Sequence, residues 1–349
     1  MLERLLIVGL GSIGRRHARI ARQLLPNAEI VALRHRGCPG GTEQGIDRCV
    51  ATIEEALRLK PQAAVIANPA THHLTAAGVL ADAGVHLLVE KPIASSTAGV
   101  AELISRARAR NSVLMTGYNL RYLPSLRSFR DLVIGGRVGR ALSVRSEIGQ
   151  FLPSWRPESD YRQTVSAQAA LGGGALLELS HDIDYLRWIF GAVDLVSAIL
   201  SRQGTLEIDV EDSAHLVLRF ASVDNQMPLL ATLNMDFLRH DTTRGCTVIG
   251  ETGSLRWNAI TGVVDVFEAG STGWTVLFAH RASRDESYLG EWHDFISCIA
   301  DGTEPTVTGA DGLAVLGVIE AARRSSSCGA VERVDRSGNA DRPENMAGW

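Results

Sequence analysis

Short apolar runs alternate with amphipathic segments through the first third of the chain. The runs at 5–8, 29–33, 63–67 and 85–89 consist mostly of Leu, Ile, Val and Ala, and helix-like segments separate them. Continuous apolarity over so few residues predicts strands that are buried on both faces. Strands that alternate with helices favour a mostly parallel sheet with right-handed crossovers.

The pattern changes after residue 120. Apolar and polar side chains alternate over 141–150, and further strand-like runs follow at 197–201, 213–220, 229–236, 244–250, 253–257 and 263–267. We predict an α/β domain over 1–120, an α+β domain over 121–325 and a polar tail over 326–349. A sheet of this size needs cover on one face, which pairing of subunits would supply. A homodimer or homotetramer is expected.

Composition narrows the class of protein. The chain has 349 residues, enough for two domains, and its formal net charge of −4 leaves no basic footprint for nucleic acid. No apolar run could span a bilayer, and the N-terminus shows no signal peptide. The five cysteines are scattered, as is typical of reduced thiols without a disulfide framework or a metal site. We expect a cytoplasmic protein without membrane or nucleic-acid partners.

A glycine-rich turn follows the first predicted strand and precedes a helix. Its residues are Gly9, Leu10, Gly11, Ser12, Ile13 and Gly14. In this context Gly9 permits a tight turn, Gly11 permits close approach of a pyrophosphate, and Gly14 permits close packing of helix on strand. The backbone of Ser12 and Ile13 opens the helix, whose N–H groups favour phosphate. The turn predicts a dinucleotide site.

The second predicted strand ends in Arg34 and His35. An acidic residue at this place would bond the ribose hydroxyls of NAD, whereas arginine pairs with the 2′-phosphate of NADP. Arg34 could instead stack on adenine or face solvent. We favour NADP, with NAD as the alternative.

Two later strand ends also carry polar residues. Asn68 and Pro69 end one strand, and His73 follows as a candidate cofactor contact or a cap of the next helix. Glu90 and Lys91 end the next strand, where open α/β sheets bind their ligands. A charge pair facing solvent is the plain structural alternative for Glu90 and Lys91.

These motifs, in this order, resemble the Gfo/Idh/MocA oxidoreductases. The resemblance covers roughly residues 1–325 and rests on the glycine turn, Asn68-Pro69, Glu90-Lys91-Pro92, Gly117-Tyr118-Asn119-x-Arg121 and His181-x-x-Asp184. It implies a Rossmann domain followed by an α+β domain with a large, open, mostly antiparallel sheet. It also implies that the closing helix at 309–325 packs back on the first domain.

The resemblance implies NAD(P)-dependent redox chemistry at a sugar or cyclitol carbon. Lys91 would lie beside the substrate hydroxyl or carbonyl, and Asn119, Arg121 and Asp184 would contact the substrate. Hydride transfer from a secondary alcohol needs a base for the hydroxyl proton, and Lys91 is the candidate. Glu90 would orient Lys91 or touch the cofactor amide.

The segment 175–190 is predicted to be one helix with His181 on the same face as Glu178, three residues earlier. The family pattern places an Asp four residues before this histidine, so the spacing here departs from it. We expect His181 to be a hydrogen-bonding partner of the chemistry or a second acid/base, and Glu178 to take the role of that Asp.

A loop after residue 150 is rich in aromatic and arginine side chains: Trp155, Arg156, Tyr161 and Arg162. Rings and guanidinium groups suit sugars and anions, and a subunit contact is the alternative use. With Arg121, these arginines favour an activated or acidic sugar as substrate. Two other functions stay open: glycoside hydrolysis by transient oxidation with bound NAD, and a non-catalytic sensor that binds NADP.

Overall fold

The computed structural model describes residues 2–34, 45–222 and 227–335. The described residues form two compact units, one within 2–119 and 288–313 and one within 120–287 and 314–335. The first unit therefore includes a late segment that lies outside the predicted range 1–120. There, Thr116 donates its hydroxyl to the carbonyl oxygen of Thr308 at 3.0 Å.

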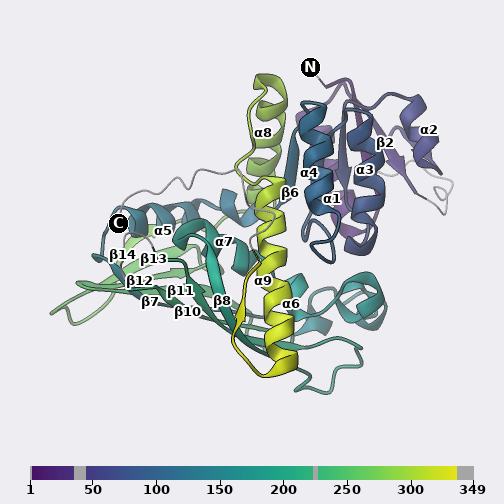
Figure 1. Ribbon diagram of the computed structural model, residues 1–349. Coiled ribbons are helices and arrows are strands. Elements are labelled where there is room, and N and C mark those ends of the chain that lie inside the picture. The colour runs from purple at the N-terminus through teal and green to yellow at the C-terminus, as the bar shows by residue number, and fades with distance from the viewer. Residues whose placement is uncertain (1, 35–44, 223–226, 336–349) are drawn as a thin grey trace. The chain divides into compact units, whose positions relative to one another are not determined.

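A six-stranded, all-parallel sheet is the centre of the first unit (Figure 1). Its strands, in the spatial order β3-β2-β1-β4-β5-β6, are β3 (Arg48–Val50), β2 (Glu29–Leu33), β1 (Arg4–Val8), β4 (Ala63–Ile66), β5 (His86–Glu90) and β6 (Leu114–Gly117). The helices are α1 (Ser12–Leu24), α2 (Ile53–Arg58), α3 (His73–Asp82) and α4 (Val100–Ala109). The predicted parallel sheet is confirmed, and the order reverses between β1 and β4, where such sheets bind nucleotides.

The core of this unit has the expected composition. Every residue of β4 is buried, and Leu5, Leu6 and Ile7 of β1 are fully inaccessible to solvent. Such strands can only be central in a sheet covered on both faces. Thr52 caps α2 by accepting a hydrogen bond from the backbone N–H of Glu55 at 3.2 Å.

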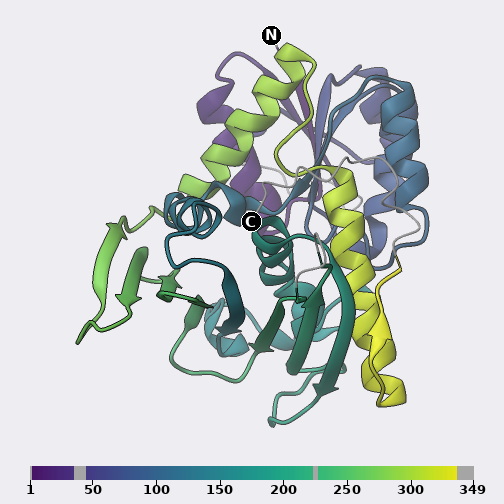
Figure 2. The same ribbon diagram turned by 60° about the vertical axis from the view of Figure 1, so that its left-hand side comes forward.

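A nine-stranded sheet is the centre of the second unit (Figure 2). Its strands, in spatial order, are β14 (Thr275–Ala279), β13 (Val263–Glu268), β12 (Gly253–Asn258), β11 (Thr243–Gly250), β7 (Ala141–Gly149), β10 (Leu230–Asp236), β9 (Ser213–Phe220), β8 (Val193–Ser201) and β15 (Glu332–Arg333). Only β7 and β10 pair in parallel among these strands, so the expected mostly antiparallel sheet is confirmed.

Helices α5 (Pro124–Ile134), α6 (Ala175–Glu178) and α7 (His181–Phe190) belong to the second unit. The buried ring of Trp257 joins α5 and α7 to the sheet: it packs edge-on against Tyr185 at 5.3 Å and donates its N–H to Ser125 at 3.0 Å. One face of the sheet is thereby covered within the unit.

The remaining helices are α8 (Glu286–Asp301) and α9 (Gly309–Cys328). The hydroxyls of Ser325 and Ser326 on α9 accept hydrogen bonds from the backbone N–H groups of Ala198 and Leu200 on β8, each at 2.9 Å. Helix α9, drawn in yellow, accordingly runs beside this strand in Figure 2. Since α9 continues to Cys328 and β15 pairs with β8, the ordered chain extends beyond the predicted start of a tail at residue 326.

One prediction about the cysteines is wrong. Cys246, Cys298 and Cys328 are free thiols, but Cys49 is disulfide-bonded. No helix in the described ranges is both long and apolar enough to cross a membrane.

Candidate functional site: the carboxyl edge of the first sheet and a pocket of the second unit

The glycine turn lies between β1 and α1. Gly9 has a φ of +91°, and a Cβ there would come within 2.8 Å of the backbone nitrogen of Asn68. A Cβ on Gly14 would come within 2.0 Å of the Gly9 carbonyl oxygen, so the fold itself requires glycine at both positions. A Cβ on Gly11 would meet no described atom within 4 Å. This open space leaves the backbone of Gly11 accessible to a pyrophosphate.

Helix α1 begins directly at this turn. Gly11 is its N-cap residue, and no described side chain caps the helix. The backbone N–H groups of its first turn, from Ser12 and Ile13 onward, are therefore left for phosphate oxygens, which the helix dipole also favours.

Arg34 follows β2 at the same edge. It is half-buried, and its backbone N–H donates to the carbonyl oxygen of Val50 at 3.0 Å. His35, the other residue predicted here, lies outside the described residues.

Asn68 and Pro69 follow β4, the neighbour of β1. The Oδ1 atom of Asn68 is buried and has no hydrogen-bond partner among the residues that the structure describes. A buried carbonyl oxygen without a partner is costly, so this atom is suited to accept a donor from a ligand. The open backbone at Gly11, the uncapped helix start and Asn68 together fit a dinucleotide.

His73 is buried at the start of α3. Its Nδ1 lies 3.0 Å from the carbonyl oxygen of Pro92, and its Nε2 lies 2.7 Å from the carbonyl oxygen of Asn68. Burial lowers the pKa of His73, which favours the neutral ring with one N–H. His73 therefore ties the end of β4 to the end of β5.

Glu90 and Lys91 complete the edge. Glu90 is the last residue of β5, and the residue is 7% exposed. Its Oε2 accepts the backbone N–H of Lys91 at 3.0 Å, and its Oε1 lies 2.8 Å from Nε2 of His17. Lys91 is half-buried, and the Lys91–Pro92 peptide bond is cis. Because β1, β4 and β5 are parallel neighbours, the glycine turn, Asn68 and Lys91 lie at one edge of the sheet.

Two of the predicted substrate residues contact each other in the second unit. Arg121 donates two hydrogen bonds to the carboxylate of Asp184, and both side chains are buried. Asn119, at the end of the first unit, is 5% exposed.

The sequence predicts one continuous helix that carries both Glu178 and His181, but the structure divides this segment into two helices. Glu178 ends α6, Leu179 and Ser180 form a turn, and His181 begins α7. Hydrogen bonds from Ser180 to Leu177 and from Asp182 to Leu179 span three residues and tighten the chain here. Both Glu178 and His181 are half-buried, and Glu178 accepts the hydroxyl of Ser166 at 2.8 Å.

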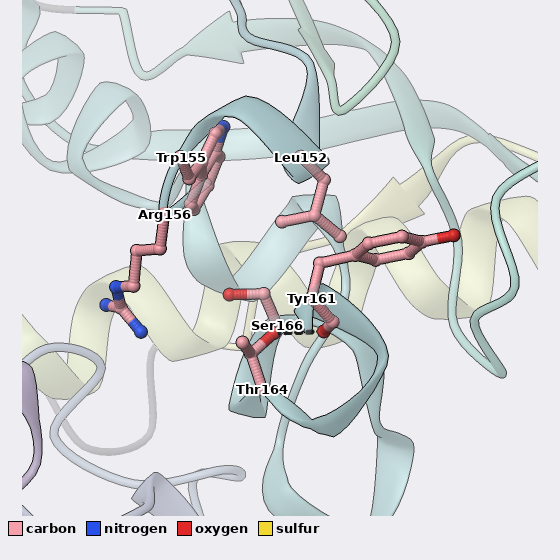
Figure 3. Close-up of a pocket in the computed structure, with 6 residues that line it drawn as sticks. All are labelled: Leu152, Trp155, Arg156, Tyr161, Thr164 and Ser166. Carbon is pink, nitrogen blue, oxygen red and sulfur yellow. Dashed lines mark hydrogen bonds between the residues drawn. The ribbon is translucent and has the colours of Figure 1, made fainter. Parts of the chain in front are cut away.

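The aromatic loop forms a pocket (Figure 3). Its lining residues are Leu152, Trp155, Arg156, Tyr161, Thr164 and Ser166. Both aromatic walls are fixed. The indole N–H of Trp155 donates to the carbonyl oxygen of Gln150 at 3.1 Å, and the hydroxyl of Tyr161 accepts the backbone N–H of Glu207 at 3.2 Å.

The two arginines of this loop differ. Arg162 is paired with Asp160 at 2.9 Å and with Glu207 at 3.3 Å, and it does not line the pocket. Arg156 lines the pocket and has no ion pair or hydrogen bond with the residues that the structure describes. The free cation of this loop is therefore Arg156.

Sequence reasoning did not find His17 or Trp292, which lie behind Glu90. The signal for His17 was its place three residues after Gly14, on the face of α1 that faces the sheet. It also missed Ser166, the link between the pocket and Glu178.

Comparison with known proteins agrees with this geometry. Residues 4–118 match the oxidoreductase family with an NAD-binding Rossmann fold, and residues 126–256 match the GFO/IDH/MocA C-terminal domain. The 1,5-anhydro-D-fructose reductase of Ensifer adhaerens is 30% identical over 291 residues, 80% of this chain and 81% of that protein. The myo-inositol 2-dehydrogenase of Thermotoga maritima is 25% identical over 339 residues, 91% of this chain and 95% of that protein.

Among solved structures, a levoglucosan dehydrogenase in complex with NADH has the same fold. The TM-score is 0.83 at 21% identity, over 95% of this chain and 99% of that one. Both halves of the chain and its overall fold thus agree in one assignment: it belongs to the Gfo/Idh/MocA oxidoreductases, with an NAD-binding Rossmann domain.

Proposed function

We propose that the protein is an NAD(P)-dependent dehydrogenase or reductase that acts on a secondary hydroxyl or carbonyl carbon of a sugar. The observation that carries this proposal is the position of Lys91, directly after β5, at the edge that also holds the glycine turn and Asn68. The names of its relatives, a 1,5-anhydro-D-fructose reductase and a myo-inositol 2-dehydrogenase, support a sugar or cyclitol substrate.

In this proposal the protein supplies binding and proton transfer. The backbone at Gly11 and the first turn of α1 hold the pyrophosphate, and Asn68 accepts a hydrogen bond from the cofactor. When bound, the nicotinamide supplies the hydride acceptor or donor. Lys91 takes the proton of the substrate hydroxyl in oxidation and returns it in reduction. In the second unit His181 hydrogen-bonds the substrate or serves as an alternate acid/base, and Glu178 supports it.

We infer that the sugar is acidic or carries an activating phosphate group. The support is the pocket with two fixed aromatic walls and the unpaired guanidinium of Arg156. Aromatic rings suit the apolar faces of a sugar, and a guanidinium binds a carboxylate or phosphate with two hydrogen bonds.

We favour NADP as the cofactor, with NAD as the alternative. The support is Arg34, which stands directly after β2, where an acidic residue would favour NAD. Stabilisation of the protein against heat by NADP but not by NAD is the expected result, and a clear preference for NAD would overturn the role of Arg34.

We also infer that the outer face of the second sheet joins subunits into a homodimer or homotetramer. Ile199 of β8 and Val217 of β9 point to this face and are 67% and 45% exposed. Apolar side chains at strand centres favour burial by a second copy. Light scattering should give a dimer or tetramer mass that Ile199→Asp reduces, and a monomeric wild type would refute the inference.

The proposed activity is tested with a panel of neutral sugars, cyclitols and uronic acids, each with NAD⁺ and NADP⁺ and, for keto sugars, with the reduced cofactors. Formation or loss of reduced nicotinamide with at least one compound is expected. Net glycoside hydrolysis without reduced cofactor would instead indicate transient oxidation. Cofactor binding without turnover of any compound would indicate a sensor.

A further inference from the structure

Within the first unit, two buried hydrogen bonds link Trp292 to His17 and His17 to Glu90. The indole N–H of Trp292 on α8 donates to Nδ1 of His17 on α1 at 3.0 Å, and Nε2 of His17 lies 2.8 Å from Oε1 of Glu90. His17 and Trp292 are fully inaccessible to solvent. Gly117 provides room, since a Cβ there would lie 3.2 Å from Oε2 of Glu90.

This geometry fixes the protonation of His17. An indole nitrogen can only donate, so Nδ1 of His17 must present its lone pair and carries no proton. The single ring proton is therefore on Nε2, which donates to Glu90. His17 is thus a neutral donor, and it brings no positive charge to the carboxylate.

Glu90 is accordingly an ionised carboxylate with both oxygens bonded. Burial acts to raise its pKa, but the hydrogen bond from His17 and the electrostatic attraction of that ring, then the charge and the backbone N–H of Lys91, lower it below the ordinary value. Lys91 is the cation nearest in sequence, and buried His73 also faces this charge.

Among the described acidic groups packed around His17 and Trp292, Glu90 is the one that carries a negative charge. Glu291 on α8 is fully buried, and neither of its oxygens has a partner in the described part of the chain. Burial, and then the charges of Glu90 and Asp294, raise its pKa well above the ordinary value, so Glu291 is a neutral acid. Burial and Glu90 likewise raise the pKa of Tyr288, whose ring lies under the guanidinium of Arg16 at 4.8 Å.

We propose that His17 and Trp292 are positioning residues that hold Glu90 as a fixed, buried carboxylate, and that this charge makes the cofactor site favour oxidised over reduced nicotinamide. The proposal rests on the cofactor-binding part of the proposed function. The oxidised ring carries a positive charge and the reduced ring does not. A buried anion at the carboxyl edge of β5, with no imidazolium beside it, therefore stabilises the oxidised form selectively.

The test compares dissociation constants for NADP⁺ and NADPH, and for NAD⁺ and NADH, by calorimetry. Glu90→Gln should weaken binding of the oxidised form about tenfold and leave the reduced form within about twofold, since a factor of ten corresponds to about 1.4 kcal/mol. Glu291→Gln is the matched control, because it makes the same change at an adjacent carboxyl group that is already neutral. An equal effect of both variants, or none of Glu90→Gln, would overturn the proposal.

Trp292→Phe tests the positioning role separately, since it removes the indole N–H and keeps an aromatic ring. In ¹⁵N NMR spectra the wild type should show His17 protonated on Nε2 alone, and the variant should show protonation on Nδ1 as well, because the Glu90 carboxylate still holds the proton on Nε2. The preference for oxidised cofactor should then shrink. An unchanged His17 spectrum would refute the role of Trp292 even if Glu90→Gln did not fold.

These measurements do not depend on turnover. If the protein oxidises a sugar but Glu90→Gln keeps the preference for oxidised cofactor, only this inference is refuted. If Glu90→Gln loses the preference for oxidised cofactor as expected but the protein turns over no sugar, only the proposed activity is refuted.

Discussion

Arg121 and Asp184 form a buried, bidentate ion pair in the second unit. Nε and Nη2 of Arg121 donate to the two carboxylate oxygens of Asp184 at 2.8 and 2.6 Å. Their side chains are 3% and 0% exposed. The sequence had offered both residues as substrate contacts, but their opposite charges are matched by each other. We therefore expect the loss of Arg121 to lower the stability of the fold more than the affinity for substrate.

Replacement of Arg121 by Ala should lower the free energy of unfolding by about 3–5 kcal/mol, because it leaves the charge of Asp184 buried without its partner. Denaturant unfolding measures this. Arg156→Ala is the control, since that arginine is exposed and makes no ion pair with the described residues, and it should change stability by less than about 0.5 kcal/mol. An Arg121→Ala protein of normal stability with a raised KM would show that Arg121 binds substrate instead.

Removal of the amine of Lys91 should slow the chemical step. Lys91→Ala should reduce kcat by about 10²–10⁴-fold, the usual contribution of a general acid or base. Lys91→Arg should be nearly as impaired, because a guanidinium does not release its proton. The dissociation constant of the reduced cofactor, measured alongside, should stay near that of the wild type. An active Lys91→Arg enzyme would mean that the charge alone is needed.

The glycine turn offers two substitutions of the same size with different outcomes. Gly14→Ala places a Cβ 2.0 Å from the Gly9 carbonyl oxygen and should destabilise the unit. Gly11→Ala meets open space, so the apo protein should melt as the wild type does. The added methyl group should nevertheless block the pyrophosphate and abolish stabilisation by cofactor. Cofactor-dependent melting of Gly11→Ala would place the pyrophosphate elsewhere.

Those parts of the fold that follow from local pattern could be predicted from the sequence. The buried runs and the glycine turn fixed the parallel sheet, and the carboxyl ends of parallel strands necessarily share an edge. The sequence alone therefore predicts Asn68 and Lys91 at one edge of the sheet, and the sheet order confirms it.

What the sequence could not show depends on distant contacts. His17 and Trp292 are separated by 275 positions, so no local spacing joins them. The break between Glu178 and His181 has no proline or glycine to signal it, and the expected shared helix face failed there. The residue types of Arg156 and Arg162 are identical, and only their neighbours distinguish a paired guanidinium from a free one.

Asp182 should make the stability of the protein depend on pH. Burial raises its pKa from 3.8 to about 6, although Arg244 at 3.2 Å opposes the shift. Between these values the folded state binds more protons than the unfolded state, so this group lowers stability as pH rises through the window. The contribution is about 3 kcal/mol at pH 7 relative to pH 3. The stability of Asp182→Asn relative to the wild type should therefore rise from pH 4 to pH 7 in denaturant titrations. A constant difference would show that Asp182 is not perturbed.

Arg156 and Arg162 give the last test, because they lie in one loop and differ in their partners. Asp160 and Glu207 already neutralise Arg162, whereas Arg156 lines the pocket together with Trp155 and Tyr161 and makes no ion pair with the described residues. Loss of a bidentate bond to a carboxylate should raise KM for a uronic acid about tenfold in Arg156→Ala, with kcat and the KM for a neutral sugar nearly unchanged. Arg162→Ala should leave both KM values close to the wild type. If both variants raised KM for acidic and neutral sugars alike, the loop would shape the pocket without reading charge, and the preference for an acidic substrate would be wrong.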